Sequence, residues 1–135
     1  MMREEVRDGE GTLLALVISN RKGGVPTGIE FLGDPSHAIQ VAQMRWPDGH
    51  EIARHIHIPV ERVTVGTPEV IMLREGSMRA DFYDLGRRKV WSTVCDTGDI
   101  LVLLAGGHGF TMLSECVLEE VKLGPYLGAD DKVRF

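Results

Sequence analysis

Apolar and polar residues alternate over short segments of this chain, and turn-forming residues separate the segments at intervals of about ten positions. Alternation predicts strands, because successive side chains of a strand point to opposite faces of a sheet. Short sequences such as PDG, GTP, DLG, DTGD and GGHG supply the turns between them. The predicted strands are Leu13–Ser19, Ala38–Trp46, Ile52–Ile58, Glu69–Arg74, Ser77–Asp84, Lys89–Val94, Ile100–Leu104, Phe110–Leu113 and Val117–Leu123.

Helical spacing is confined to a weak signal around Met1–Glu10. A chain of 135 residues is long enough for one domain with a core and too short for two ordinary ones. We therefore predict a single all-β domain, with residues 1–12 and 126–135 as peripheral arms. Within it, the turn at Glu75–Gly76 predicts a hairpin between the two strands that flank it.

Composition narrows the possible functions. Hydrophobic residues make up 43% and charged residues 26% of the chain, which is typical of a globular protein. The formal net charge of −5, without a basic run, argues against a nucleic-acid partner. No segment resembles a signal peptide or a membrane helix, so we expect a soluble cytoplasmic protein without a membrane partner. In a reducing compartment, Cys95 and Cys116 are expected to be buried thiols.

Two of the five histidines, His55 and His57, lie one residue apart in a predicted strand. On a strand they share one face with Ala53, whereas the isoleucines at 52, 56 and 58 share the other. Residues two apart on a strand are roughly 6.5–7 Å apart, a separation from which two imidazoles can bind one cation. Taken alone, such a pair more often forms an ordinary polar strand face than a metal site. The isoleucine face requires a cover, such as a second subunit.

Two further residues extend this set. Glu69 begins the next apolar run, where a carboxylate is either an exposed strand-end residue or a ligand. His108 lies in the glycine-rich sequence AGGHGF, either as an ordinary turn residue or as a third imidazole. Together, these four residues offer three imidazoles and one carboxylate.

The spacing of these residues resembles that of the cupin family. The first cupin motif is a glycine, five residues, His-x-His, a short gap, and a glutamate six residues before another glycine. Here Gly49 precedes the histidine pair by five residues, and the sequence VIMLRE separates Glu69 from Gly76. The second motif is a glycine, an apolar strand and a Pro-x-Gly turn before a third histidine. Gly98 directly precedes the matching segment DILVLLAGGH, which ends at His108.

The chain also departs from the family pattern. Eleven residues separate His57 from Glu69, where the family has three or four. Glu61 satisfies the short gap without the spacing to a glycine, and is the alternative carboxylate ligand. In the second motif, Leu104 replaces the proline and Met112 stands where asparagine is frequent. The resemblance covers about residues 45–118.

The resemblance implies a double-stranded β-helix, a cupin-like jelly-roll barrel. It also implies a divalent transition metal held by His55, His57, Glu69 and His108; this donor set does not discriminate among iron, manganese, nickel, zinc and cobalt. Arg62 and Tyr83 are candidates for the substrate pocket, where an arginine would favour an anionic molecule.

The activity is predicted only by class. Small cupins include dioxygenases, isomerases or epimerases and decarboxylases. The tail and the motif spacing resemble those of single-domain cupins associated with sugar and polysaccharide metabolism, and this resemblance implies a related molecule. The alternatives are a non-catalytic small-ligand-binding module and a metal-free structural barrel. The apolar C-terminal tail, with Tyr126, Val133 and Phe135 expected to dock on the body or a neighbour, and the isoleucine face together predict a homodimer.

Overall fold

The computed structural model describes residues 2–19 and 24–135, and nearly all of its regular structure is β-strand. One short 3-10 helix, η1 (Gly128–Asp131), follows the last strand. The described part of the chain contains no helix long and apolar enough to cross a membrane. The strands are β1 (Met2–Arg7), β2 (Leu13–Ser19), β3 (Gly28–Phe31), β4 (Ala42–Arg45), β5 (Glu69–Glu75), β6 (Ser77–Tyr83), β7 (Lys89–Asp96), β8 (Ile100–Leu103), β9 (Gly107–Met112) and β10 (Val117–Lys122).

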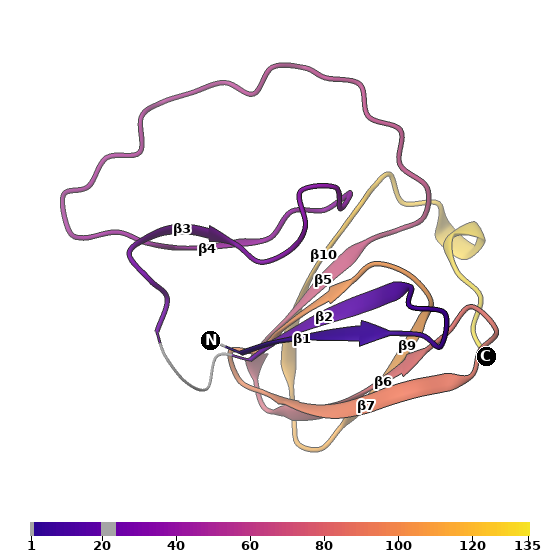
Figure 1. The fold of residues 1–135 in the computed structure, drawn as a ribbon. Coiled ribbons are helices and arrows are strands. Elements are labelled where there is room, and N and C mark those ends of the chain that lie inside the picture. The colour runs from indigo at the N-terminus through magenta and orange to yellow at the C-terminus, as the bar shows by residue number, and fades with distance from the viewer. Residues whose placement is uncertain (1, 20–23) are drawn as a thin grey trace.

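The strands form two packed sheets and a separate two-stranded ribbon (Figure 1). The larger sheet has the order β1-β2-β8-β5-β10, and the smaller one has the order β7-β6-β9. Among the described strands, β3 and β4 pair only with each other and form the ribbon. All pairs are antiparallel. Within the described residues the sheets do not close into a barrel.

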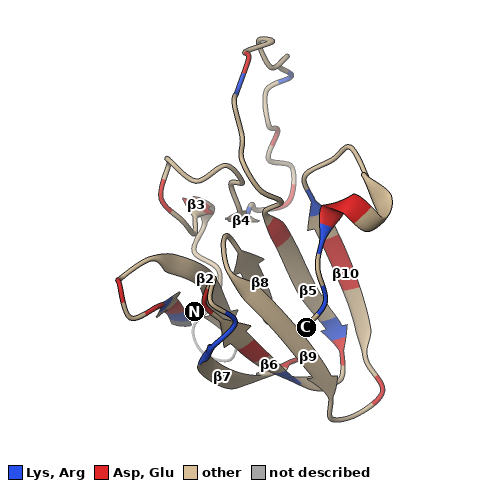
Figure 2. Ribbon diagram, turned by 90° about the vertical axis from the view of Figure 1, so that its right-hand side faces the viewer, with Lys and Arg blue, Asp and Glu red and all other residues tan. Residues whose placement is uncertain are grey.

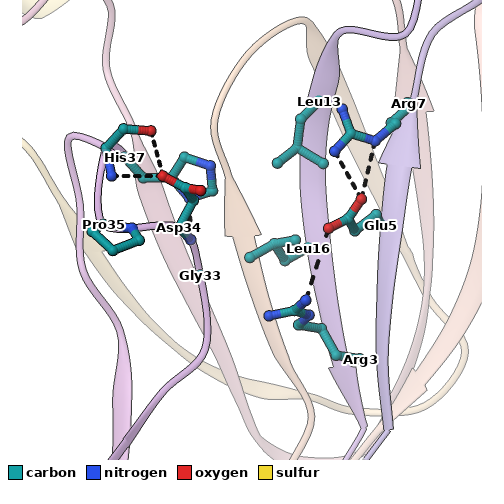
Figure 3. Close-up of a pocket in the computed structure, with 10 residues that line it drawn as sticks. Arg3, Glu5, Arg7, Leu13, Leu16, Gly33, Asp34, Pro35 and His37 are labelled. Atoms are coloured by element: carbon teal, nitrogen blue, oxygen red, sulfur yellow. Dashed lines mark hydrogen bonds and ion pairs between the residues drawn. The ribbon is translucent and has the colours of Figure 1, made fainter.

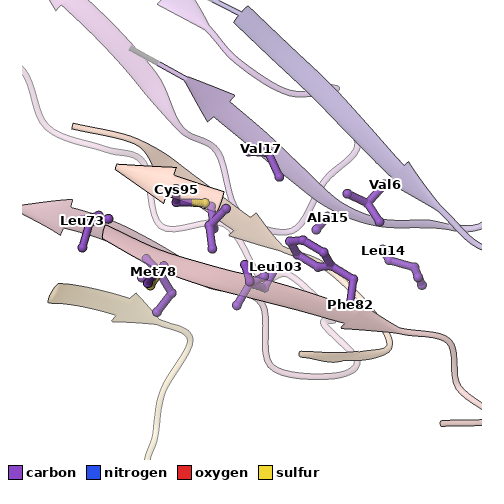
Figure 4. Packing of buried hydrophobic residues seen from close by; sticks show 12 residues of the cluster. Val6, Leu14, Ala15, Val17, Leu73, Met78, Phe82, Cys95 and Leu103 are labelled. Carbon is purple, nitrogen blue, oxygen red and sulfur yellow. The ribbon is translucent and has the colours of Figure 1, made fainter. Parts of the chain in front are cut away.

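The main core lies between the two sheets (Figure 4). Phe82 and Met78 from β6 pack there against Leu73 and Leu103 from the larger sheet, and all four are almost completely buried. A second cluster covers the other face of the larger sheet, where Leu32 packs with neighbours from β2, β5 and β8. β2 is therefore buried on both faces, which explains its continuous apolar run.

Most of the predicted strands are confirmed, with boundaries that agree to within three residues. The strand predicted for residues 38–46 is shorter, at Ala42–Arg45, and β3 was not predicted at all. Cys95 is buried in the core, as predicted, and Cys116 is partly buried, with its Sγ donating to the Ser77 carbonyl at 3.3 Å.

The prediction for the N-terminus was wrong. Residues 2–7 form strand β1, which pairs along its whole length with β2, and Val6 is buried in the main core. These residues are therefore neither helical nor peripheral, and Met1 lies outside the described residues. Pairing with β2 determines the structure of this segment more than its weak helical spacing does, because strand formation depends on the neighbouring strands more than on the local sequence.

Two further local predictions were wrong. Residues 52–58 form no strand and are exposed throughout. The turn at Gly76 does not join a hairpin, because β5 and β6 belong to different sheets. The chain instead crosses between sheets with Gly76 at φ 98°, and a Cβ there would lie 2.3 Å from the Glu115 carbonyl oxygen. Alternation alone does not specify which sheet a strand joins.

Candidate functional site

Glu69 and His108 meet at one end of the space between the two sheets. Glu69 begins β5 in the larger sheet, and His108 lies near the start of β9 in the smaller one. The Glu69 Oε2 and His108 Nε2 atoms are 3.4 Å apart. Both side chains are partly buried, with exposed fractions of 16% for Glu69 and 31% for His108. The segment of the first motif that contains Glu69 and the segment of the second motif that contains His108 therefore lie side by side in the folded chain.

The strand alternation explains why both side chains point inward. Glu69 shares a face of β5 with Ile71 and Leu73, which are both part of the main core. On β9, the ring of His108 stacks on that of Phe110 with centroids 5.4 Å apart, and Phe110 packs against the same core. The pair thus forms the polar end of an otherwise apolar interior.

Burial determines the electrostatics of this pair. It raises the pKa of Glu69 above its usual range, assisted by the nearby carboxylate of Glu120 and opposed by Lys122 and Lys132. Burial also lowers the pKa of His108, and Lys132 acts in the same direction, whereas Glu120 opposes it. At neutral pH the imidazole is therefore uncharged, which leaves one ring nitrogen with a lone pair available to a metal ion or a proton.

His55 and His57 lie on a long exposed segment, residues 46–66, which we call the arm (Figure 2). Their ring centroids are 5.2 Å apart at an interplanar angle of 75°, and His55 Nδ1 lies 2.9 Å from the carbonyl oxygen of Ala53. The two histidines are neighbours, as predicted, but they do not join the other pair in this chain. Among residues 2–19 and 24–135, no three His, Cys, Asp or Glu side chains are grouped closely enough to hold a metal.

The other predicted site residues divide between the arm and the body. Glu61 and Arg62 are both exposed on the arm, where the Arg62 guanidinium donates to the Val60 carbonyl at 3.4 Å. Tyr83 ends β6 directly opposite Gly107, the residue before His108. Its ring packs edge-to-face with that of Phe135, with centroids 5.1 Å apart. Tyr83 is therefore paired with the residue before His108, but strand alternation places its ring, together with Phe135, on the face of the smaller sheet opposite to the His108 ring.

Four charged residues near the pair were not predicted. Lys122 on β10 is opposite Glu69 in the register, and Glu120 is on the same face of that strand. Asp131 and Lys132, at the end of η1, also act electrostatically on Glu69, and Asp131 accepts a hydrogen bond from Thr67 at 3.3 Å. For Glu120 and Lys122, the charged residues in the sequence VLEEVK were the available signal, but only the strand register relates them to Glu69.

A separate hollow of about 420 Å³ lies between strands β1 and β2 and the loop at residues 33–37 (Figure 3). Arg3 and Arg7 line it, and both form ion pairs with Glu5 at 3.9 and 2.8 Å. Asp34, on the other wall, accepts hydrogen bonds from Ser36. These charges are paired within the hollow, and none of its lining residues belongs to the Glu69–His108 region.

Comparisons with protein-family models, with curated proteins and with solved structures gave no match for this chain.

Proposed function

We propose that this chain is a cupin-like jelly-roll protein that binds a divalent transition metal through His55, His57, Glu69 and His108. The metal-bound protein acts on, or binds, a small polar or anionic molecule.

The observation that carries this proposal is the contact between Glu69 and His108. The two residues were selected from separate sequence motifs, and their side chains come from opposite sheets to within 3.4 Å. A carboxylate and a neutral imidazole, both partly buried and directed into the interior, are donors that fit a first-row divalent ion. The remaining two donors are the imidazoles of the arm, already side by side.

A bound ion would act as a Lewis acid that polarises an oxygen atom of the ligand. The chain's own residues would define the pocket around it. Lys122 and Lys132 lie near the pair beside the carboxylates of Glu120 and Asp131, so groups of both charges are available to a small polar or anionic molecule, such as a sugar derivative.

Metal content is the direct test. Protein purified without chelator should contain close to one transition-metal ion per chain. His108→Ala, and His55→Ala combined with His57→Ala, should each lose most of it. His37→Ala is the matched control, because it removes a histidine outside the proposed set. A wild-type metal content near zero, unchanged after reconstitution with iron, manganese, nickel, zinc or cobalt, would refute the proposed site.

A second measurement separates an enzyme from a binding module. The metal-loaded protein is incubated with sugars, sugar nucleotides and small carboxylates, while oxygen consumption and product formation are followed. Turnover of one of them would identify a dioxygenase, isomerase, epimerase or decarboxylase type of reaction. Binding without turnover would instead favour the non-catalytic alternative.

A further inference from the structure

The arm exposes more apolar surface than a stable isolated chain normally does. Every residue from 44 to 66 is exposed, and the side chains of Ile56 and Val65 are 92% and 94% accessible. In the described chain, each hydrogen bond or ring contact of the arm joins residues at most four positions apart. The arm therefore has no packing partner in its own body, and its apolar side chains require a cover. The exposed apolar residues of the arm are Ile52, Ile56, Ile58, Val60, Val63 and Val65.

In the part of the chain that the structure describes, the body of the protein has two strand edges without a neighbouring strand. β9 and β10 are the last strands of their sheets, so each offers a row of backbone groups to a further strand. On the opposite side, the edge strands β1 and β7 contact each other. Within the described residues, the sandwich is thus open on the β9 and β10 side, except near the start of β9, where Phe135 at the end of the tail packs against Tyr83 and Gly107. Exposed apolar side chains border this opening at Met112, Leu113, Val117, Leu118, Val121 and Leu123.

The incomplete metal site is on this open side. His108 belongs to β9, and Glu69 is opposite Lys122 of β10. A strand added to the free edge of β9 would run about 4.8 Å from it, with alternate side chains directed into the interior. Two histidines at alternate positions of such a strand would reach the region of His108.

We propose that the arm of one chain lies along the open β9 and β10 side of a second copy of this chain. There it brings its His55 and His57 to the Glu69 and His108 of that copy. This inference rests on the proposed metal site and specifies how that site is completed: each ion is held by two chains.

The isoleucines of the arm favour a second copy over closure within one chain. If the arm closed on its own body with His55 and His57 inward, Ile56 and Ile58 would point outward to solvent. The ribbon exposes apolar side chains of its own, at Ile29, Phe31 and Met44. A second copy adds further apolar surface that can cover this outward face.

The size of the exchanged surface also fits a dimer. An arm of about 20 residues, with the ribbon that carries it, matches the roughly 20–30 residues a side of a stable protein interface. The same chain carries both the arm and its acceptor edge. In a dimer with a two-fold axis, the arm of each copy therefore covers the open side of the other copy, and no arm or open side is left uncovered. The arm runs from β4 of the ribbon to β5 of the larger sheet and arches away from both sheets between these two ends (Figure 1).

The molar mass in solution is the first test. The wild-type protein should be a dimer of twice 14.9 kDa by light scattering. Ile56→Asp combined with Ile58→Asp should yield a folded monomer, with circular dichroism confirming the fold, because these residues are outside the core. Leu85→Asp alters an equally exposed apolar residue in the turn between β6 and β7, and should remain dimeric. A monomeric wild type, or a dimer that survives the arm substitutions, would overturn the inference.

Complementation tests the shared site itself. One variant carries His55→Ala with His57→Ala, and the other carries Glu69→Gln with His108→Ala, each with a different affinity tag. Each variant alone should lack metal, whereas the co-expressed heterodimer should contain one ion, because one of its two sites receives all four native ligands. If each site lay within one chain, both sites of the heterodimer would be defective and its metal content would stay near zero, which would overturn the inference.

A heterodimer of the wild type with the His55→Ala and His57→Ala variant is the control, since it should hold one ion in either arrangement. The failure of the proposed function is distinguishable from the failure of arm exchange. If the wild type binds no metal, the proposed site is refuted, and the light-scattering comparison alone decides whether the arm joins two copies.

Discussion

The carboxylate of Glu69 and the imidazole of His108 are 3.4 Å apart, although they belong to different sheets and to separate segments of the sequence. Their partly buried position favours the uncharged form of the histidine. Two donors are thus held by strands that are themselves fixed by the core, through Ile71 next to Glu69 and Phe110 next to His108. A site on such strands is more rigid than one built on loops.

The first prediction concerns the choice of carboxylate. Glu69→Gln should lower metal retention by at least tenfold, because an amide is a far poorer ligand than a carboxylate, and tenfold corresponds to about 1.4 kcal/mol. Glu61→Gln, on the exposed arm, is the matched variant and should retain wild-type metal content. Titration with Zn²⁺ or Co²⁺ in the presence of a competing chelator measures both. Loss of metal in the Glu61 variant alone would show that the alignment of the first motif is wrong.

The second prediction concerns Asp81, a nearly buried carboxylate on β6. Hydrogen bonds from Ser92, then Lys89 and Arg79, lower its pKa to about 2. Since the folded-state pKa lies below the unfolded value of 3.8, this group stabilises the protein fully above about pH 4 and loses that contribution as the pH falls towards 2.

Asp81→Asn should therefore lower the free energy of unfolding at pH 7 by roughly 1–3 kcal/mol, the range for hydrogen bonds to charged groups. The difference from the wild type should shrink between pH 4 and pH 2. Urea denaturation across this range measures it, with the exposed Asp130→Asn as control. If the difference in unfolding free energy between the variant and the wild type stayed constant with pH, Ser92, Lys89 and Arg79 would not be the groups that lower the pKa of Asp81.

The third prediction concerns Gly76, where the chain crosses between the sheets. Gly76→Ala should destabilise the fold on two grounds: the positive φ of 98° and a Cβ 2.3 Å from the Glu115 carbonyl oxygen. Gly11→Ala is the matched control, because Gly11 also has a positive φ, of 87°, but faces open space. The control should lose about 1–2 kcal/mol, and the Gly76 variant clearly more. Equal losses in thermal or chemical unfolding would show that the contact with Glu115 is unimportant.

The fourth prediction concerns the core between the sheets. Phe82→Ala should reduce the free energy of unfolding by about 3–5 kcal/mol, because Phe82 is completely buried and its removal leaves a cavity. Leu85→Ala, three residues along and exposed, should change it by less than about 0.5 kcal/mol. Chemical denaturation of the two variants side by side provides the comparison. A small loss at Phe82 would mean that the two sheets do not pack as described.

Much of the fold could be predicted from alternation, but not the parts that depend on distant partners. The alternation predicted β2, β5, β6 and β8. The apolar residues of these strands are buried whichever neighbour each strand pairs with. β1 was not predicted, since only its pairing with β2 and the burial of Val6 make it a strand. Residues 52–58 alternate like a strand, but none of the described residues of the chain provides the backbone hydrogen bonds that a strand needs.

The candidate site was predictable to a similar extent. Spacing identified Glu69 and His108, and strand alternation directed both inward. Their neighbours Glu120 and Lys122 were not predictable, because only the register of β10 against β5 relates them to Glu69. The location of His55 and His57 is set by the arm, and a single sequence contains no information about what the arm contacts.

The most direct measurement is a crystal structure of protein loaded with Co²⁺ or Zn²⁺, with the metal located by anomalous scattering. We predict one metal per chain, bound by nitrogen atoms of His55, His57 and His108 and by a carboxylate oxygen of Glu69, at about 2.0–2.2 Å. A metal peak bound by other residues, or the absence of any peak near Glu69 and His108, would contradict the proposed site.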